Sequence, residues 1–137
     1  MSDRTITSLT NPTVKAVRAL HLRKAREETG QFLAEGLKIV GEAVATGHAP
    51  QILLHGAEAA GHPVLKTAAA AARAAGGEVI EVSRDILAKV SRRDNPQTVL
   101  GVFAQTFTPL ADLKPGGARC WVALQAVRDP GNLGTII

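Results

Sequence analysis

The sequence predicts an α/β protein, a three-layer α/β/α sandwich over a largely parallel sheet. Short apolar runs typical of buried strands alternate with segments whose apolar residues recur at helical spacing. The 137-residue chain is 45% hydrophobic, which is enough for one packed core. A segment rich in Pro and Gly at 106–119 is a linker by composition, so we expect a domain at 1–105 and a separate segment at 120–137.

The first helix is predicted over residues 12–26. Asn11 can accept a hydrogen bond from the helix N-terminus, and Pro12 suits the first helical position. Val14 and Val17 begin an apolar stripe at helical spacing. The other face is strongly basic, with Lys15, Arg18, Arg23, Lys24 and Arg26. The alternatives are a solvated helix face and a phosphate-binding face, which would relieve the repulsion between like charges.

The rest of the first domain continues the alternation. Gly47 and Gly76 provide helix stops, and Ser83 is a good N-cap. Apolar and β-branched runs predict strands at 31–36, 50–55, 78–82 and 98–104. Helices are predicted between them at 37–44, 64–75 and 84–90.

The last segment contains a strand, a polar loop and the start of a helix. Residues 120–124 are an apolar run that predicts a buried strand, and residues 129–132 are dense in turn-forming types. A helix is expected to start near Leu133. Strand, loop and helix start is where α/β folds place ligand loops, although an ordinary surface turn has the same composition.

Composition limits the partners and the compartment. The net charge of +4 favours a polyanionic partner, since clustered Lys and Arg release counterions at phosphates. Aromatic residues make up only 3% of the chain, which argues against single-strand stacking platforms. The one cysteine, Cys120, lies in an apolar run, so we expect a buried thiol and a cytoplasmic protein. No signal peptide or membrane span is expected.

Metal and nucleotide sites are not expected. His48, His55 and His62 recur at seven-residue intervals, and His21 is the fourth histidine. No Cys or carboxylate completes a tetrahedral set with them, so no metal is predicted. A dinucleotide fingerprint needs glycines after a strand, whereas Gly116 precedes one.

Four motifs carry a resemblance to a known family. The sequence Arg128-Asp129-Pro130-x-Asn132-x-Gly134-Thr135-Ile136 resembles the first signature motif of the SpoU (TrmH) family of RNA ribose 2′-O-methyltransferases, in the knotted SPOUT superfamily. Further matches are Ile6-x-Ser8-x-x-Asn11-Pro12-x-Val14-Lys15, Gly30-x-Phe32-Leu33-x-Glu35-Gly36, and Asn95-Pro96-Gln97-x-Val99-Leu100-Gly101-Val102. Thr98 departs from this pattern, because relatives often have Gly after the Gln.

The resemblance implies a fold and an activity. Residues 1–105 are expected to be a substrate-binding domain with the α/β/α fold of kink-turn-binding ribosomal proteins, and 120–137 the truncated start of the SPOUT catalytic domain. The implied full-length enzyme uses S-adenosyl-L-methionine to methylate a ribose 2′-oxygen of rRNA or tRNA, and forms a homodimer through its catalytic domain. We expect the 137-residue chain alone to be inactive, because the family's catalytic arginine falls just past Ile137. Since relatives dimerise through the catalytic domain, a monomer is an option for this chain.

The resemblance also suggests roles for particular residues. Asn132 would orient the catalytic arginine, or simply cap a helix, and Gly134 would allow close backbone packing. Arg128 is open to two roles, a phosphate contact or a pair with Asp129. Glu35, beside the turn at Gly36, is expected to be a structural acceptor rather than a general base. The candidates for phosphate contact in the first domain are Arg23, Lys24, Arg26, Arg92 and Arg93, with Lys15 and Arg18 on the same helix.

Two other functions remain open at this point. A stand-alone RNA-binding module of the ribosomal-protein type would need no catalytic extension, so residues 120–137 argue against it. A small α/β domain that binds protein, with incidental positive charge, is the third possibility.

Overall fold

The computed structural model describes residues 4–114, 116–117 and 120–137. Its centre is a five-stranded sheet in the order β1-β4-β3-β5-β2. The strands are β1 (Arg4–Ile6), β2 (Gln31–Glu35), β3 (Ile52–His55), β4 (Glu78–Val82) and β5 (Val99–Ala104). Strand β4 runs parallel to both β1 and β3, whereas β5 runs antiparallel to both β3 and β2.

The sheet is therefore mixed, and the expectation of a largely parallel sheet was wrong. Val99, the first residue of β5, pairs with His55, the last residue of β3. The chain between β4 and β5 thus stays at the end of the sheet where β3 and β4 finish, and β5 runs back from there in the opposite direction. Strand β1 was not predicted, since three residues are too few for a period-2 pattern.

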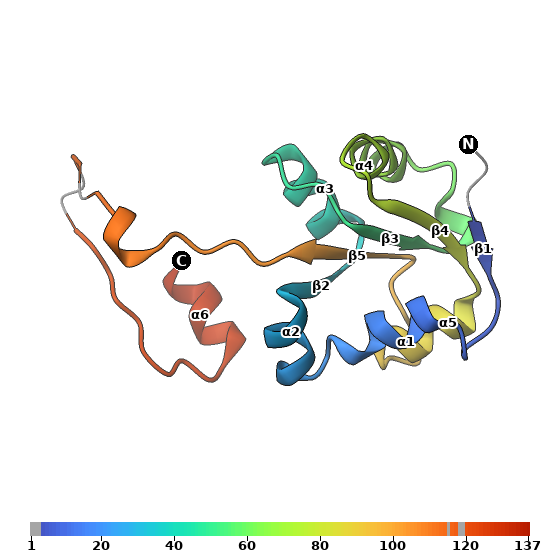
Figure 1. Ribbon diagram of the computed structural model, residues 1–137, viewed down its shortest axis with the longest axis horizontal. Coiled ribbons are helices and arrows are strands. Elements are labelled where there is room, and N and C mark those ends of the chain that lie inside the picture. Colours follow the sequence, from blue (N-terminus) through green and yellow to red (C-terminus); the bar gives the residue numbers. More distant parts are fainter. Residues whose placement is uncertain (1–3, 115, 118–119) are drawn as a thin grey trace. The chain divides into compact units, whose positions relative to one another are not determined.

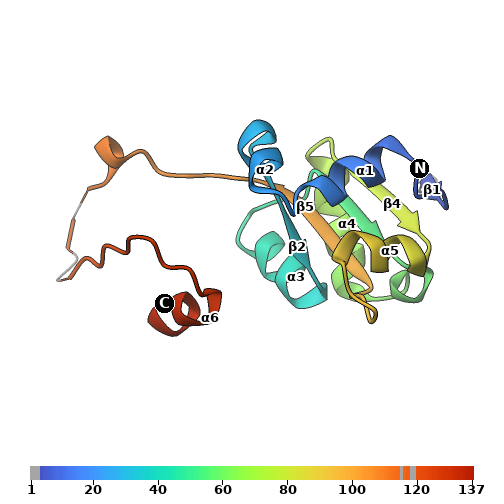
Figure 2. The same ribbon diagram turned by 90° about the horizontal axis from the view of Figure 1, so that it is seen from below.

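Helices cover both faces of the sheet (Figures 1 and 2). On one side lie α1 (Pro12–Ala19) and α5 (Arg84–Ser91), with α2 (Arg23–Thr29) near the β2 edge. On the other side lie α3 (Leu37–Ala45) and α4 (Pro63–Ala74). This arrangement confirms the three-layer α/β/α sandwich. Among the described residues, no helix is both long and apolar enough to span a membrane.

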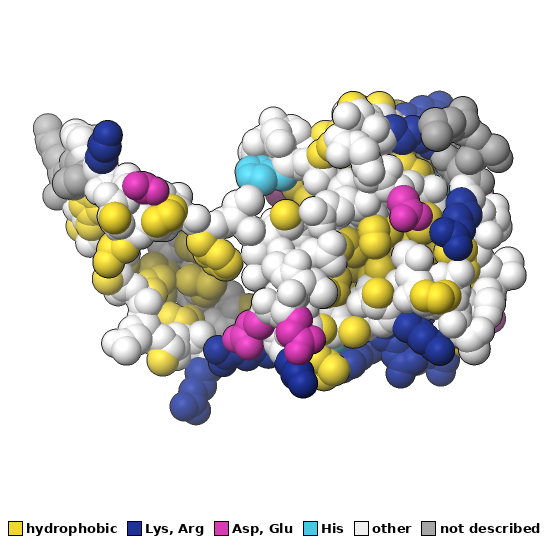
Figure 3. Space-filling model, viewed as in Figure 1, with side chains coloured by type: hydrophobic (Ala, Val, Ile, Leu, Met, Phe, Trp, Pro, Cys, Tyr) yellow, Lys and Arg dark blue, Asp and Glu magenta, His cyan; other side chains and the backbone are white. Residues whose placement is uncertain are grey.

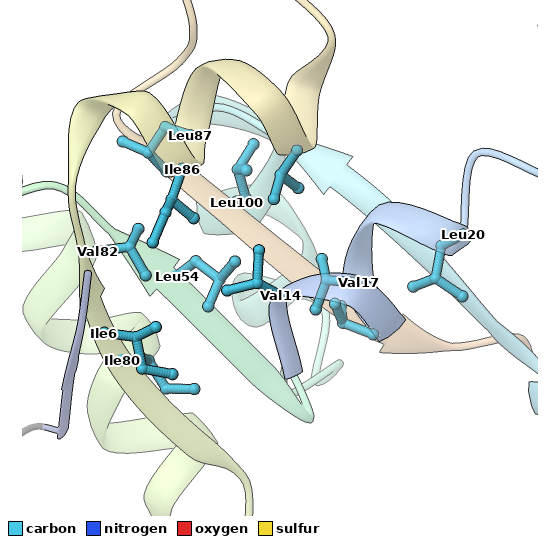
Figure 4. Packing of buried hydrophobic residues seen from close by; sticks show 12 residues of the cluster. Ile6, Val14, Val17, Leu20, Leu54, Ile80, Val82, Ile86, Leu87 and Leu100 are labelled. Carbon is cyan, nitrogen blue, oxygen red and sulfur yellow. The ribbon is translucent and has the colours of Figure 1, made fainter. Parts of the chain in front are cut away.

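A separate apolar cluster lies on each side of the sheet. Figure 4 shows Val14 and Val17 of α1 and Ile86 of α5 pointing toward Leu54 and Leu100 of the strands. On the opposite side α4 contributes three alanines, Ala68, Ala69 and Ala72, besides Leu65, and these small side chains let the helix pack close to the strands. Burial of these side chains fixes which faces of the helices remain exposed to solvent.

The predicted helix at 12–26 is interrupted, which corrects that expectation. Leu22 has an extended backbone, so α1 ends at Ala19 and α2 begins at Arg23. Leu20 is buried in the core, and the His21 ring hydrogen-bonds the carbonyl of Val90 on α5. These contacts between distant parts of the chain hold the break, and the local sequence contains no Gly or Pro to announce it.

The chain continues into a second compact unit, Phe107–Ile137. It contains a short 3₁₀ turn, η2 (Leu110–Asp112), and helix α6 (Pro130–Ile136). The prediction of a buried strand at 120–124 was wrong. These residues are not in a strand and all of them are exposed, Cys120 included. A strand needs a neighbour for its backbone hydrogen bonds, and no described residue pairs with this segment.

Candidate nucleic-acid interface

Exposed basic side chains occupy the helical layer made by α1 and α5. Lys15 and Arg18 lie on α1, Lys89 lies on α5, and Arg92 is the C-cap of α5. Within the described part of the chain, none of these four residues forms an ion pair. We refer to them as the α1/α5 basic surface. Figure 3 shows Lys and Arg side chains gathered along the side of the first unit where α1, α2 and α5 lie.

The exposed cations of α2 differ, because each already has an acidic partner one helical turn away. The Arg23 Nε donates to Glu27 Oε1 at 2.6 Å, and the Lys24 Nζ lies 3.8 Å from Glu28 Oε1. The hydrogen bond to Glu27 and its negative charge raise the pKa of Arg23. A phosphate at this helix would meet two carboxylates as well as two cations, so its attraction is weaker than at the α1/α5 basic surface.

Arg26 is half-buried and holds the junction between α1 and α2. Its Nη1 donates to the carbonyl oxygens of Leu20 and His21, at 2.8 and 2.9 Å. These carbonyls lie beyond the last residue of α1 and would otherwise lack helical partners. The structure therefore gives Arg26 a bracing position, and its phosphate contact stays a prediction.

Two of the motifs in the first unit meet at the end of β2. The Arg93 Nε lies 3.4 Å from Glu35 Oε2, and the Gly36 N–H donates to the carbonyl of Val99 at 2.8 Å. Gly36 has φ +100°, and a Cβ there would lie 3.1 Å from the Gln97 side-chain oxygen. A glycine is thus required both by the backbone angle and by the close contact.

Glu35 itself is mostly enclosed. Its side chain is 19% exposed, and its Oε2 is buried without a hydrogen-bond partner in the described residues. The sequence identified Glu35 as a structural acceptor, but its partner Arg93 could not be found from spacing. Arg93 was expected to contact phosphate, but in the structure its guanidinium is paired with the Glu35 carboxylate. Its phosphate contact stays a prediction.

A cavity of about 360 Å³ lies beside Glu35, at the open edge of the sheet. The Glu35 carboxylate, the Arg26 guanidinium and the His21 ring are its polar groups. The apolar lining comes from Leu20, Phe32 and Leu33. This concave mixture of charged and apolar groups was not expected from the sequence, because its residues come from the junction between α1 and α2, from α2 and from β2.

The motif residues of the second unit are exposed. The Asp129 carboxylate caps α6 by accepting a hydrogen bond from the Asn132 backbone at 2.9 Å, so Asp129 and not Asn132 is the helix cap. Arg128 forms no ion pair with Asp129 in the described structure. No atom lies within 4 Å of the position a Cβ would take on Gly134. The functional roles expected for these residues stay predictions.

The histidines His48, His55 and His62 lie in separate local environments. His62 caps α4 by accepting from the Val64 backbone at 3.2 Å, and His48 lies 3.2 Å from the Thr46 hydroxyl. His55 is buried at the end of β3. Within the described ranges, no group of three or more His, Cys, Asp or Glu side chains is placed to hold a metal ion.

Residues 11–101 match the profile of a family described as the MRM3-like substrate binding domain. The chain is 36% identical to an uncharacterized tRNA/rRNA methyltransferase of Synechocystis, over 96% of this chain and 47% of that protein. It is 32% identical to the 23S rRNA (guanosine(2553)-2′-O)-methyltransferase RlmP of Bacillus subtilis, over 96% of this chain and 48% of that protein. The chain thus spans about half the length of these relatives.

The chain is also similar to solved structures of RNA methyltransferases. An rRNA methyltransferase from Sinorhizobium meliloti is 42% identical, with a TM-score of 0.73 over 82% of this chain and 41% of that one. An RNA 2′-O ribose methyltransferase is 29% identical, with a TM-score of 0.68 over 96% of this chain and 49% of that one.

Proposed function

Because the chain belongs to the family of MRM3-like substrate-binding domains, we propose that it binds the RNA substrate of a 2′-O-ribose methyltransferase. The proposed enzyme uses S-adenosyl-L-methionine and acts on rRNA or tRNA in the cytoplasm. Relatives whose names specify RNA methylation, one of them at a ribose 2′-oxygen, support this class of reaction. We further propose that the enzyme works as a homodimer.

The observation that carries the RNA-binding part is the α1/α5 basic surface. Its four cations are exposed and free of acidic partners within the described residues, so they are available to phosphates. Few aromatic side chains accompany them, which suits recognition of a folded RNA by its backbone and shape. Each phosphate contact releases condensed counterions, so the binding should weaken steeply as salt is added.

The methyl donor is not assigned to residues of this chain. All the described residues from 120 to 137 are exposed, including Asn132 and Gly134. Transfer of a methyl group from a sulfonium donor needs an enclosed pocket that excludes water from the reacting atoms. These residues do not enclose one by themselves, and we derive no step of methyl transfer through them.

Methyl transfer by the gene product that contains this chain tests the proposed activity. Labelled S-adenosyl-L-methionine should pass its methyl group to RNA, and the product should resist alkaline cleavage at one ribose. Resistance arises because the 2′-oxygen is no longer free to attack the neighbouring phosphate. A methylated base, or RNA binding without transfer, would contradict the assignment, and the second result would favour a stand-alone RNA-binding module.

A further inference from the structure

We propose that Glu35 is a positioning residue for RNA binding. Its carboxylate holds the Arg93 guanidinium in place, and the remaining N–H groups of that guanidinium bind a phosphate of the RNA. The proposal rests on the proposed function, and it adds to the α1/α5 basic surface a fifth cation that is oriented before RNA binds. Glu35 acts through Arg93 and does not itself contact the RNA.

The main chain places Arg93 beside the α1/α5 basic surface. Arg93 directly follows Arg92, the C-cap of α5 and a member of that surface, and the Arg93 N–H donates to the carbonyl of Ala88 at 3.2 Å. Two residues later the Asn95 side chain accepts a hydrogen bond from Arg84 of α5 at 3.3 Å. The backbone that carries the guanidinium is therefore anchored to α5 at two points.

Glu35 reaches the guanidinium from the edge strand of the sheet. Side chains alternate along β2, and Leu33, on the same face as Glu35, packs against the core that α1 and α5 share. The Glu35 carboxylate is mostly enclosed, and its buried Oε2 lies 3.4 Å from the Arg93 Nε. An enclosed carboxylate has few alternative partners, so this pair is held more firmly than an ion pair between two exposed side chains.

Much of the Arg93 side chain is nevertheless open to solvent. It is 61% exposed, and within the described residues it forms no ion pair other than the one with Glu35. A guanidinium carries five N–H donors, one on Nε and two on each Nη. Because the Nε is the atom paired with Glu35, the donors of the Nη groups remain for a phosphate, whose oxygens a planar guanidinium contacts in pairs.

The carboxylate has two opposite effects on RNA binding. An arginine that is already held loses less side-chain freedom when a phosphate binds it, so the orientation strengthens binding. The negative charge of Glu35 by itself repels phosphate and weakens binding. Removing the charge without changing the size of the side chain shows which effect is larger, and the proposal requires that it is the orientation.

Glu35→Gln in the 137-residue protein is that substitution. Fluorescence anisotropy at low salt measures Kd, with whichever of a folded tRNA transcript and a folded 23S rRNA hairpin binds the unchanged protein more tightly. Glu35→Gln should bind about two- to tenfold more weakly, as expected when one more long side chain must be ordered on binding. Unchanged or tighter binding would overturn the proposal, because a carboxylate that only repels phosphate gives that result.

Glu27→Gln is the matched control. It also removes one negative charge and one arginine–carboxylate pair, but Glu27 and its partner Arg23 are both exposed and lie on the same helix. RNA binding by Glu27→Gln should equal or exceed that of the unchanged protein. A loss as large as that of Glu35→Gln would contradict a particular role for the enclosed carboxylate.

A double-mutant cycle separates an effect through Arg93 from an effect on the fold. Arg93→Ala should weaken binding by itself, and adding Glu35→Gln to it should weaken binding no further. The same additional loss in both backgrounds would show that Glu35 does not act through Arg93.

If Glu35→Gln does not fold, as judged by circular dichroism, Glu35→Asp takes its place. It keeps the charge and draws the carboxylate back by one methylene, so weaker binding is expected at the same net charge. Unchanged binding by a folded Glu35→Asp protein would refute the positioning role.

Failure of this role and failure of the proposed function give different results. Salt-dependent RNA binding that Glu35→Gln does not weaken would remove the positioning role alone. Absence of RNA binding by the unchanged protein at low salt would remove the proposed function, and with it the phosphate contact of Arg93.

Discussion

Replacing Arg26 tests whether this residue braces α2 or contacts phosphate. Arg26→Ala removes two hydrogen bonds, to the carbonyls of Leu20 and His21. Arg26→Lys keeps the positive charge, but its shorter side chain lacks the planar Nη1 group whose two N–H bonds reach both carbonyl oxygens. Helix α2 has seven residues and no side-chain N-cap, so its position depends strongly on this brace.

The expected loss of stability follows from those contacts. Hydrogen bonds that involve a charged group contribute about 1.5–3 kcal/mol each, and partial exposure favours the lower end. Arg26→Ala should therefore lower the free energy of unfolding by about 2–3 kcal/mol, and Arg26→Lys by about half as much. In a domain of this size the larger loss lowers the melting temperature by about 10 °C or more.

Urea unfolding followed by far-ultraviolet circular dichroism measures the change. Tryptophan fluorescence is unsuitable, because Trp121 lies outside the folded first unit. Arg23→Ala is the matched control: the same side chain is exposed there and bonds only Glu27, so its midpoint should stay close to that of the unchanged protein. If Arg26→Ala is as stable as Arg23→Ala, the bracing role is refuted.

Three further substitutions probe the first unit by the same unfolding measurement. Gly36→Ala should cost about 1–3 kcal/mol, because alanine is strained at φ +100° and its Cβ meets Gln97; a neutral result would show that the β2–α3 turn relaxes freely. Ser83→Ala should cost about 1 kcal/mol, since the Ser83 hydroxyl accepts from the Ile86 backbone at the start of α5. Ile86→Ala should cost about 2–5 kcal/mol, because the side chain is fully buried. Losses below these ranges would mean that the cap or the core is less important than described.

The sequence predicted the elements whose pattern is local. Asn11 and Pro12 marked the start of α1, and Ser83 marked the start of α5, because caps act within one helical turn. The alternation of apolar runs with helical stripes was enough for the layers of the sandwich. Features that depend on distant contacts were missed, namely the break between α1 and α2, the short strand β1 and the direction of β5.

In the candidate site, too, the local features could be read from the sequence and those that depend on distant contacts could not. The positions of the basic residues are readable in the sequence, and the acidic partners of Arg23 and Lys24, four residues further along, were also readable as helix pairs. The pair formed by Glu35 and Arg93 is not, because only the folded sheet brings β2 next to the end of α5. The strand expected at 120–124 failed because an apolar run predicts burial without saying what would cover it.

Salt dependence of binding to a structured RNA tests the central claim most directly. Lys15→Ala/Arg18→Ala and Arg23→Ala/Lys24→Ala each remove two positive charges, so they match in net charge and differ only in which helix loses the charge. The slope of log Kd against log salt should fall by roughly two for the first pair, at about 0.9 for each phosphate that the protein no longer neutralises. It should change much less for the second pair, whose cations are already held by Glu27 and Glu28. Equal slopes for the two variants, or a greater loss for the second, would contradict the α1/α5 basic surface as the RNA-binding face.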